Sequence, residues 1–489
     1  MDKLKALILW TSTIILLFST LGFREMWTQE HRWYDIVSTM FYYHDFLHPK
    51  LDGVDYYDKP LLSYWLIAIF SYVSGHINLW TLRLPSALAG LLSVWSIYRI
   101  GFYLKDACFG LLAAGMLLTS YYFVFWAHIS NADMLNLGGT LFALSWYFEK
   151  RNHASLYDEM IFFLILAVTA LCKGLVGPVV VILAIFPDLI LQKTFFKYFK
   201  RSFFVALIPA IGIYTLPFYL SLHWGDAAHY TENGFMEVYR ENILRYFKPF
   251  DHEEPFYVYF FYFPLYLFPW VFFFVPALFT LKSRWQTLSL HSKWMFWATV
   301  ILFLFFTLSG SRRSYYILPV VPFAILFTAD WIFASRHRLS AAKQWIKITF
   351  LSLIFLFVVF FPIYYSKGGV NTFGQVLLAE TNKIKPWKEW HIVLLDAEYK
   401  LNYYLHLPPT VQNFDPHMLR ESQTKEIMLE HWPILVSQPR DTLIISRKLH
   451  EPLLREVLTT YKIVEASPTY MEKLFNIVDP NSPIAFIPR

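Results

Sequence analysis

Ionisable side chains border long apolar runs in this sequence. The clearest cases are Asp133, in Ile129-Ser-Asn-Ala-Asp-Met134, and Lys173, in Leu171-Cys-Lys-Gly174. An ionisable group beside a run that enters a membrane is costly unless it is paired or faces a wet cavity, so it marks a functional site by default. Taken singly, each could equally reach back to the interface or close a structural ion pair.

Further polar and ionisable side chains fall in connectors on the same side of the predicted membrane as these two residues. They are Glu25, Gln29, Glu30, Arg32, Asp35, Asp58, Lys59, Arg240, Arg245, His252, Arg312, Arg313 and Tyr316. Cations and carboxylates beside apolar walls suit a phosphate-bearing lipid. Lys and Arg would hold the phosphate, and carboxylates would bind sugar hydroxyls or deprotonate an acceptor.

The elements that position these residues are predicted to be membrane-spanning helices. The chain has 489 residues, of which 56% are hydrophobic, 20% aromatic and 16% charged. A soluble chain carries roughly 25% charged residues, so disorder and most soluble enzymes are excluded. Apolar stretches long enough to span or enter a bilayer fall at roughly 4–23, 61–75, 84–103, 108–127, 132–148, 159–172, 174–191, 202–222, 257–281, 294–309, 315–334 and 346–365.

The basic connectors predict the topology. Residues 193–201, 282–284 and 336–338 are rich in Lys and Arg and should face the cytoplasm. The basic connectors and the basic amino terminus can all face the cytoplasm only if the short stretch 61–75 begins and ends on the outer side, as a re-entrant or surface segment. We therefore expect a polytopic α-helical membrane domain of about eleven spans over residues 1–365, with outer loops at 24–83 and 223–256.

Residues 366–489 change character. The β-type runs Trp390-His-Ile-Val-Leu-Leu395 and Thr442-Leu-Ile-Ile-Ser446 alternate with helix-like polar stretches. This pattern predicts a small soluble α/β domain on the outer side.

Two partner classes are disfavoured by composition. The formal charge of +6 could suggest nucleic acid, but the cations cluster between apolar runs, as membrane anchoring requires. Cys108 and Cys172 have no partner spacing for a zinc site or a disulfide. Because the cations are placed for membrane anchoring, we expect no nucleic-acid partner. We also find no phosphate-binding nucleotide fingerprint, and therefore expect no nucleotide cofactor.

Six motifs occur in an order that resembles a known family. They are Tyr56-Tyr-Asp-Lys-Pro-Leu-Leu-Ser-Tyr-Trp65, Arg83-Leu-Pro-Ser-Ala-Leu-Ala-Gly90, Asn131-Ala-Asp-Met134, Cys172-Lys-Gly174, Glu241-Asn-Ile-Leu-Arg-Tyr-Phe247 with Pro269-Trp270, and Leu308-Ser-Gly-Ser-Arg-Arg-Ser-Tyr-Tyr-Ile-Leu-Pro319. Over residues 4–335 the chain resembles bacterial membrane glycosyltransferases of the GT-C class. It is most similar to the aminoarabinose transferases (ArnT type) that modify lipid A, which are relatives of the protein O-mannosyltransferases.

The resemblance implies a set of catalytic carboxylates. In the family an Asp-Glu pair follows the first span, and its Asp is the suspected catalytic group. Aligning Arg32 and Asp35 puts Gln29 at that Asp and Glu30 at the Glu. Since glutamine cannot take a proton at neutral pH, the resemblance leaves that duty to Glu30 or Asp133, or implies an acceptor that needs no deprotonation, or a catalytically dead relative.

The resemblance also implies how the donor is held. By matching position, the donor phosphate would be bound by Arg32, Lys59, Lys173, Arg245, Arg313 and Tyr316. Asp58 with His252 would match a metal pair, here a zinc ion, although two ligands are few for such a site.

The implied function is transfer of one sugar, with inversion, from a polyprenyl phosphate carrier to lipid A or another envelope acceptor. The reaction would take place at the periplasmic face of a bacterial inner membrane, and the outer loops and domain would then be periplasmic. The alternatives are a protein acceptor, as in the O-mannosyltransferases, and a transporter or flippase for the lipid-linked sugar. A transporter would show broken helices in corresponding halves, and this sequence has no such internal symmetry.

Overall fold

The computed structural model describes residues 3–27, 29–197, 200–224, 234–249, 252–365, 369–411, 413–414, 441–475 and 479–488. They form two compact units. The first comprises Met1–Leu21, Phe46–His48 and Tyr57–Val358, and the second comprises Gly22–Asp45, Pro49–Tyr56 and Val359–Arg489. This division differs from the predicted boundary after residue 365, because most of the segment 22–56 shares a unit with the C-terminal residues rather than with the spans.

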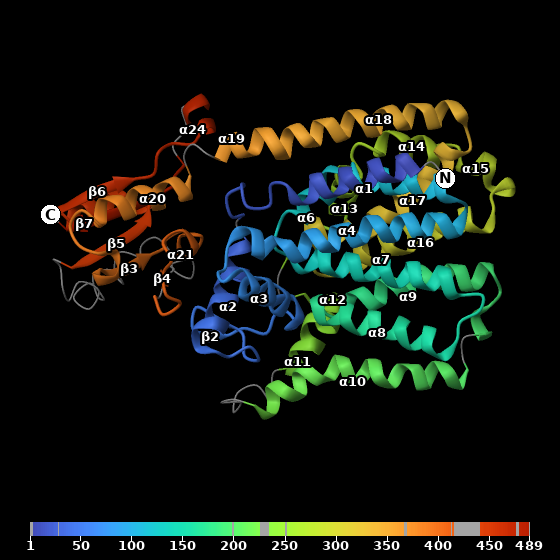
Figure 1. Ribbon diagram of the computed structural model, residues 1–489, viewed down its shortest axis with the longest axis horizontal. Helices are drawn as coiled ribbons and strands as arrows, with labels where there is room; N and C mark the ends of the chain where they lie inside the picture. Colours follow the sequence, from blue (N-terminus) through green and yellow to red (C-terminus); the bar gives the residue numbers. More distant parts are fainter. Residues whose placement is uncertain are drawn as a thin grey trace. The chain divides into compact units, whose positions relative to one another are not determined.

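The first unit is helical (Figure 1). Its helices are α1 (Lys3–Phe18), α3 (Leu62–Ser74), α4 (Leu79–Leu104), α5 (Ala107–Leu118), α6 (Tyr121–Ala127), α7 (Ala132–Lys150), α8 (Leu156–Lys173), α9 (Val176–Leu191), α10 (Arg201–His223), α11 (Gly234–Tyr239), α12 (Arg245–Phe247), α13 (Val258–Tyr266), α14 (Val271–Phe279), α15 (Leu281–Arg284), α16 (Leu290–Leu308), α17 (Val321–Phe333) and α18 (Arg336–Ile354). Among the described residues, 5 helices are long and apolar enough to cross a membrane, or up to 7 if each bent pair is one span. The chain is a multi-pass membrane protein.

Two apolar stretches that were predicted as single spans are bent. The stretch 108–127 forms α5 and α6, which meet at 71°, and the stretch 257–281 forms α13 and α14, which meet at 117°. Between α5 and α6, Ser120 has extended backbone (φ −83°, ψ 120°), so the helical hydrogen-bond series stops there. The stretch 61–75 forms the short helix α3, whose 13 residues are few for a span.

Small residues and polar caps position the helices that carry the ionisable groups. A Cβ on Gly138 would lie only 3.0 Å from the carbonyl oxygen of Ala89, so glycine lets α7 pack closely against α4. Asn131 caps α7, accepting a hydrogen bond from the Met134 amide at 2.7 Å and donating to the carbonyls of Trp126 (2.8 Å) and Ile129 (2.6 Å). The first turn of α7 is therefore fixed in place.

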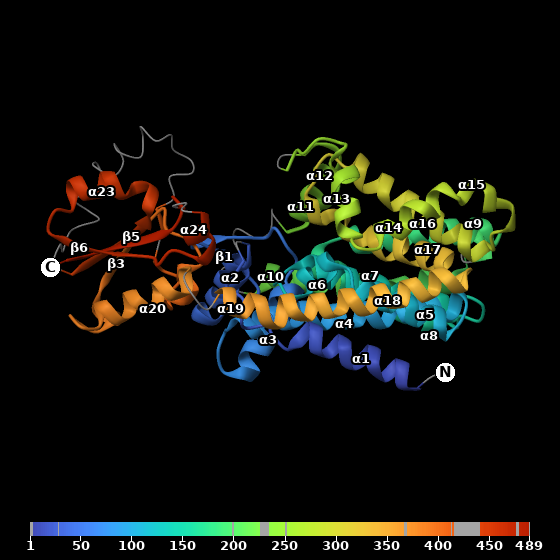
Figure 2. The ribbon, with the colours of Figure 1, turned by 90° about the horizontal axis from the view of Figure 1, so that it is seen from above.

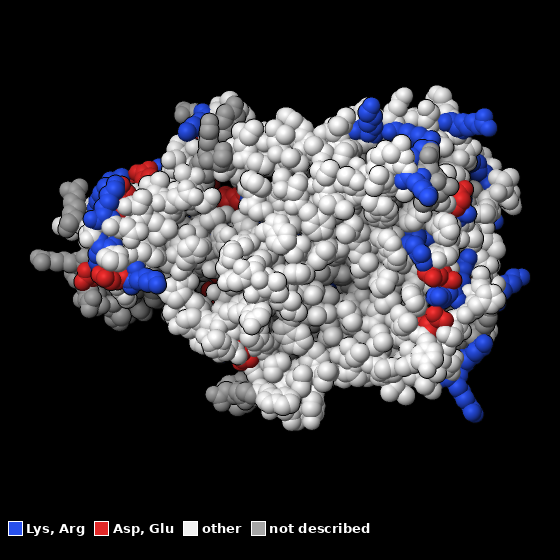
Figure 3. All heavy atoms as spheres, in the orientation of Figure 1, with Lys and Arg blue, Asp and Glu red and all other residues white. Residues whose placement is uncertain are grey.

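One end of the first unit is rich in charge, whereas its flank is apolar. On the face seen in Figure 3, charged side chains gather at the end near the amino terminus and α15. Buried Asp188 accepts hydrogen bonds from Arg151 at 2.9 Å and from the Tyr147 hydroxyl at 2.8 Å. Along α10, Phe204 and Ile208 are exposed, as expected of a surface that faces lipid.

The second unit is built on a mixed five-stranded sheet. The helices are α2 (Glu30–Tyr43), α19 (Phe361–Tyr365), α20 (Val370–Thr381), α21 (Leu401–Tyr404), α23 (Glu451–Val457) and α24 (Tyr470–Phe475), and the strands are β1 (Lys50–Leu51), β2 (Val54–Asp55), β3 (His391–Leu395), β4 (Asn413–Phe414), β5 (Thr442–Arg447), β6 (Tyr461–Glu465) and β7 (Pro483–Pro488). The strand order is β4-β3-β5-β7-β6. Strands β4, β3 and β5 are parallel, and β7 is antiparallel to both of its neighbours.

Both faces of this sheet are buried. Alternate side chains such as Leu394 and Ile445 pack with α20, while Leu395 and Ile444 pack with α23. Figure 2 shows the two helices on opposite faces of the sheet. The predicted α/β character of the C-terminal region is therefore present in this unit.

The segment 22–45 is bound to the C-terminal part of the second unit. The Met26 amide donates to the Tyr404 hydroxyl at 2.9 Å, and the Asn402 side chain donates to Asp35 at 3.2 Å. The rings of Tyr34 and Tyr403 pack edge to face at 5.2 Å. These contacts fix α2, and with it the start of the helix at Glu30.

Candidate functional site

The loop before α3 holds an acid and a base together. The Nζ atom of Lys59 lies 2.8 Å from Oδ1 of Asp58 and donates to the Asp58 carbonyl at 3.1 Å. The Ser63 hydroxyl donates to the Pro60 carbonyl at 3.2 Å and closes the turn into the helix. Lys59 is therefore held at the start of α3 by its own neighbours.

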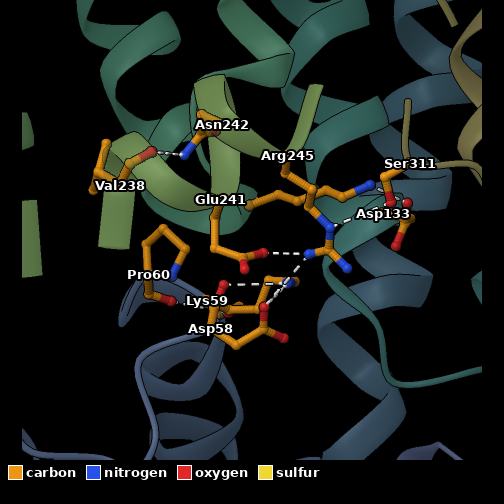
Figure 4. A network of polar contacts seen from close by, with 11 residues as sticks. Asp58, Lys59, Pro60, Asp133, Val238, Glu241, Asn242, Arg245 and Ser311 are labelled. Atoms are coloured by element: carbon orange, nitrogen blue, oxygen red, sulfur yellow. Dashed lines mark hydrogen bonds and ion pairs between the residues drawn. The ribbon is translucent and has the colours of Figure 1, made fainter. Parts of the chain in front are cut away.

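A short helical segment meets this loop. Residues 234–247 run through α11, a π-helical turn over Arg240–Leu244 and α12. One helical turn separates Glu241 from Arg245, and the two form an ion pair. The Arg245 guanidinium also donates to the Ser311 hydroxyl at 3.4 Å and lies 3.8 Å from Asp58 Oδ1. Figure 4 shows these groups converging.

Asp133 and Lys173 form a second part of the site. Lys173, the last residue of α8, donates to the carboxylate of Asp133 in the first turn of α7. Its Nζ also lies 4.8 Å from the centre of the Tyr316 ring. The charges of Lys59 and Arg245 act on Lys173, and Figure 4 places Asp133 beside Ser311 and Arg245.

One asparagine links the two parts. Gly174 follows Lys173 with a φ of +107°, and the next amide, of Leu175, donates to the Asn242 side-chain oxygen at 2.6 Å. A Cβ on Gly174 would lie 2.5 Å from that oxygen. Since Asn242 follows Glu241, the same helical turn contacts the Arg245 side of the site and fixes the turn that carries Lys173.

The two carboxyl groups near Arg245 titrate differently. Burial alone would raise the pKa of Asp58, but the charge and hydrogen bond of Lys59, a hydrogen bond from Glu241 and the charge of Arg245 hold that pKa well below its usual range. Burial and the neighbouring Asp58 carboxylate raise the pKa of Glu241 to about 7. Asp58 is therefore ionised at neutral pH, whereas Glu241 is partly ionised there and mostly ionised at pH 8.

Arg312 and Arg313, the two arginines of the motif at 308–319, differ in their surroundings. The Arg312 side chain donates to the carbonyls of Glu254 at 2.7 Å and of Thr307 at 3.1 Å, so it holds the loop together. Arg313, which we predicted as a phosphate ligand, is half-buried. Its guanidinium makes no hydrogen bond or ion pair to the residues that the structure describes.

The metal pair predicted at Asp58 and His252 has an unfavourable setting. Asp58 is bound to Lys59 and lies near Arg245, and two cations oppose the approach of a divalent ion. The described ranges contain no group of three or more His, Cys, Asp or Glu residues that could hold a metal ion. The residues present do not fit a metal centre, and the metal stays a prediction without support from the geometry.

Two predicted site residues belong to the second unit. Glu30 begins α2, is fully buried, and its Oε2 accepts a hydrogen bond from the Trp27 amide at 2.8 Å. Arg32 is exposed on the first turn of the same helix. Their roles stay predictions.

Sequence reasoning gave no role to Glu241, Asn242 or Ser311. Glu241 and Asn242 stand in the quoted motif at 241–247, and Ser311 in the motif at 308–319. The available signal was spacing, because an acid four residues before Arg245 on a helix faces that arginine.

The chain resembles known proteins in sequence. Residues 58–217 match the family model described as dolichyl-phosphate-mannose-protein mannosyltransferase. The undecaprenyl phosphate-alpha-4-amino-4-deoxy-L-arabinose arabinosyl transferase of Shewanella sediminis (strain HAW-EB3) is 26% identical over 402 residues, which are 79% of this chain and 70% of that protein. The protein of the same name from Pectobacterium atrosepticum is 25% identical over 390 residues, 75% of this chain and 68% of its own length.

Solved structures share the fold. ArnT from Cupriavidus metallidurans, in a crystal structure bound to undecaprenyl phosphate, superposes with a TM-score of 0.74 at 14% identity, covering 99% of this chain and 98% of that chain. The archaeal oligosaccharyltransferase AglB from Archaeoglobus fulgidus, with an inhibitory peptide and a dolichol-phosphate, gives a TM-score of 0.56 at 12% identity, covering 91% and 69%. The chain thus has the fold of these two membrane proteins, and in sequence and fold it resembles the GT-C glycosyltransferases of the ArnT type.

Proposed function

We propose that the chain transfers a sugar from a polyprenyl phosphate carrier to lipid A or another envelope acceptor. The observation that carries the proposal is the joining of Lys59, Lys173 and Arg245 in one largely buried polar cluster. These residues come from three distant stretches, and each lies in a motif of the resemblance. The whole-chain fold match to ArnT bound to undecaprenyl phosphate, and the names of the arabinosyl transferases, support the choice of donor, and lipid A as acceptor rests on the motif resemblance.

The reaction is a substitution at the anomeric carbon. An acceptor oxygen forms a bond to that carbon from the side opposite the lipid phosphate. The bond between the anomeric carbon and the phosphate oxygen breaks, and its electron pair stays on the phosphate. The centre is inverted, and the products are the glycosylated acceptor and polyprenyl phosphate. A nucleotide is not required, because the leaving phosphate is already attached.

The cations would act on the leaving group. Charge grows on the phosphate as the bond breaks, and fixed cations at that point lower the barrier. Lys59, Lys173 and Arg245 are held in place by their partners, and Arg313 would add to them. Tyr316, in contact with Lys173, would lie beside the same phosphate.

The proton of the acceptor needs a base only when the acceptor is a hydroxyl. Asp133 or Glu30 would then take it, with Gln29 unable to do so. A phosphate acceptor is already ionised at neutral pH and needs no base. The ion pair of Asp133 with Lys173 favours a positioning role for that carboxylate beside any proton transfer.

The membrane placement is part of the proposal. We place the amino-terminal, charge-rich end of the first unit in the cytoplasm, the site at the periplasmic face of the inner membrane, and the second unit in the periplasm. About eleven spans satisfy the basic connectors, if bent and short apolar helices are counted. The gathering of Lys and Arg at one end of the first unit supports this orientation (Figure 3).

The deciding experiment is a transfer assay without nucleotides. Purified protein is incubated with lipid A and a panel of polyprenyl phospho-sugars, and the acceptor mass is read by mass spectrometry. A sugar-sized gain with wild type, lost in Lys59→Ala and kept in the matched surface variant Lys462→Ala, supports the proposal. No gain with any donor, also after Gln29→Asp, contradicts it. If Glu30→Gln and Asp133→Asn both keep full activity, the carboxylate assignment is wrong.

A protein acceptor is the second candidate. The match of residues 58–217 to a model described as a protein mannosyltransferase favours it. Adding serine- and threonine-rich peptides to the same assay separates the two, because a mass gain would then appear on the peptide and not on lipid A.

A further inference from the structure

Each cation at the centre of the site is already matched by a carboxylate of the chain. The three pairs are Lys59 with Asp58, Lys173 with Asp133, and Arg245 with Glu241. A phosphate that enters this cluster therefore has to compete with internal carboxylates.

The pair at Arg245 differs from the other two. Arg245 presents a planar fork of N–H donors, which suits a phosphate and a carboxylate equally well. Glu241 forms an ion pair with one side of that fork. The Arg245 Nε atom donates a hydrogen bond to the Ser311 hydroxyl at 3.4 Å, and the Arg245 Nη1 atom lies 3.8 Å from Asp58 Oδ1. The carboxylate of Glu241 therefore takes part of the guanidinium that a phosphate oxygen would use (Figure 4).

Glu241 is also more easily displaced than the neighbouring carboxylate of Asp58. Asp58 lies next to it and repels its charge, and together with burial this raises the pKa of Glu241. The charged groups that face Glu241 are Asp58, Lys59 and Arg245. Asp58, by contrast, is held by its contact with Lys59.

We propose that Glu241 competes with the carrier phosphate for Arg245 and so promotes release of the product. The inference rests on the proposed transfer reaction. The donor is a phosphodiester with one negative charge, whereas the product polyprenyl phosphate is a monoester that can carry two. A fixed carboxylate repels the second charge in addition to the first, so it weakens product binding more than donor binding.

The expected effect is measurable. Within a few ångströms, in a site shielded from water, one fixed charge changes the binding of an anion by about tenfold or more. Glu241→Gln removes the charge and keeps the size and the hydrogen-bonding capacity of the side chain. It should bind the monoester about tenfold more tightly and the diester about threefold more tightly, and turnover should fall because the product leaves slowly.

The test measures binding without transfer. Full-length protein in lipid nanodiscs at pH 8 is titrated with undecaprenyl phosphate and, separately, with its methyl diester, which has one charge and no sugar. Wild type, Glu241→Gln, Glu241→Ala and Arg245→Ala are compared. Glu465→Gln, in the exposed pair with Lys448, is the matched loss of one negative charge elsewhere and should leave both affinities unchanged.

The outcomes separate the inference from the proposed function. Tighter monoester binding in both Glu241 variants, with a smaller gain for the diester, supports the inference. If both variants bind the monoester as wild type does or more weakly, Glu241 is only a structural partner of Arg245 and the inference is overturned. A wild type that shows the expected binding pattern yet transfers no sugar contradicts the transfer reaction alone.

Discussion

The carboxyl group of Asp35 should make the second unit less stable as the pH rises. Asp35 lies on α2 with only 8% of its surface exposed, and its Oδ2 atom has no hydrogen-bond partner among the described residues. Burial raises its pKa to about 8, the Asn402 hydrogen bond lowers it in part, and the charge of Asp52 raises it further. The group is therefore neutral in the folded protein at neutral pH.

The direction and the size of this change in folding stability follow from the linkage between proton binding and folding. In the unfolded chain an aspartate ionises near pH 3.9, so folding takes up a proton at every pH between about 4 and 8. Each pH unit in that window removes about 1.4 kcal/mol of stability. The contribution of Asp35 to the free energy of unfolding is thus highest at acid pH and falls by about 4 kcal/mol between pH 5 and pH 8. Above the pKa of the folded state it no longer changes with pH.

Hydrogen exchange read by mass spectrometry measures this locally. After correction for the intrinsic pH dependence of exchange, peptides covering residues 30–43 and 398–407 should lose protection from pH 5 to pH 8 in wild type. Asp35→Asn can still accept the Asn402 hydrogen bond and carries no charge, so its protection should not vary with pH. Asp55→Asn, at an exposed position of the same unit, should behave as wild type. Equal slopes in wild type and Asp35→Asn would refute the reasoning.

Three further substitutions test other contacts. Gly174→Ala should cost about 1–2 kcal/mol and lower transfer, because its φ of +107° and the Asn242 oxygen at 2.5 Å exclude a Cβ; thermal unfolding in detergent and initial transfer rates check this. Asp188→Ala should cost about 3–5 kcal/mol, because Arg151 loses its carboxylate; an unchanged melting temperature would contradict it. Lys173→Met should lower the transfer rate about a hundredfold or more, and it should also lower the melting temperature because buried Asp133 loses its partner; a rate close to wild type would exclude Lys173 from the site.

The helices were largely predictable, because a helix that crosses the hydrocarbon of a bilayer needs a run of about 20 mostly apolar residues. The stretch 202–222 lies within α10, and the stretch 84–103 lies within α4. The bend within 108–127 was not predictable from composition. Neither Gly nor Pro stands at the break between α5 and α6, and the extended conformation of Ser120 depends on tertiary packing.

The site was predictable in its parts and not in its pairing. Lys59, Lys173 and Arg245 each stood out by type and position. Which carboxylate each one contacts depends on how distant helices pack, and one sequence does not reveal that. Glu241 was overlooked because an acid one turn before an arginine is a common surface pair on helices. Its importance appears only when Asp58 is brought beside it.

The second unit contains residues from both ends of the chain, so it cannot be completed before the C-terminal part has been synthesised. Glu25 and Asp35 accept hydrogen bonds from residues 346 and 367 positions later, and the Met26 amide donates to a residue 378 positions later. At about 5–20 residues per second, a ribosome needs roughly 20 to 70 s to make the intervening chain. Throughout that interval α2 has left the ribosome without the residues that cover it, while the spans between are being inserted. Helix α2, which begins at Glu30, is thus among the earliest segments made and among the last to acquire its final structure, and a nascent-chain experiment would find it accessible until α21 emerges.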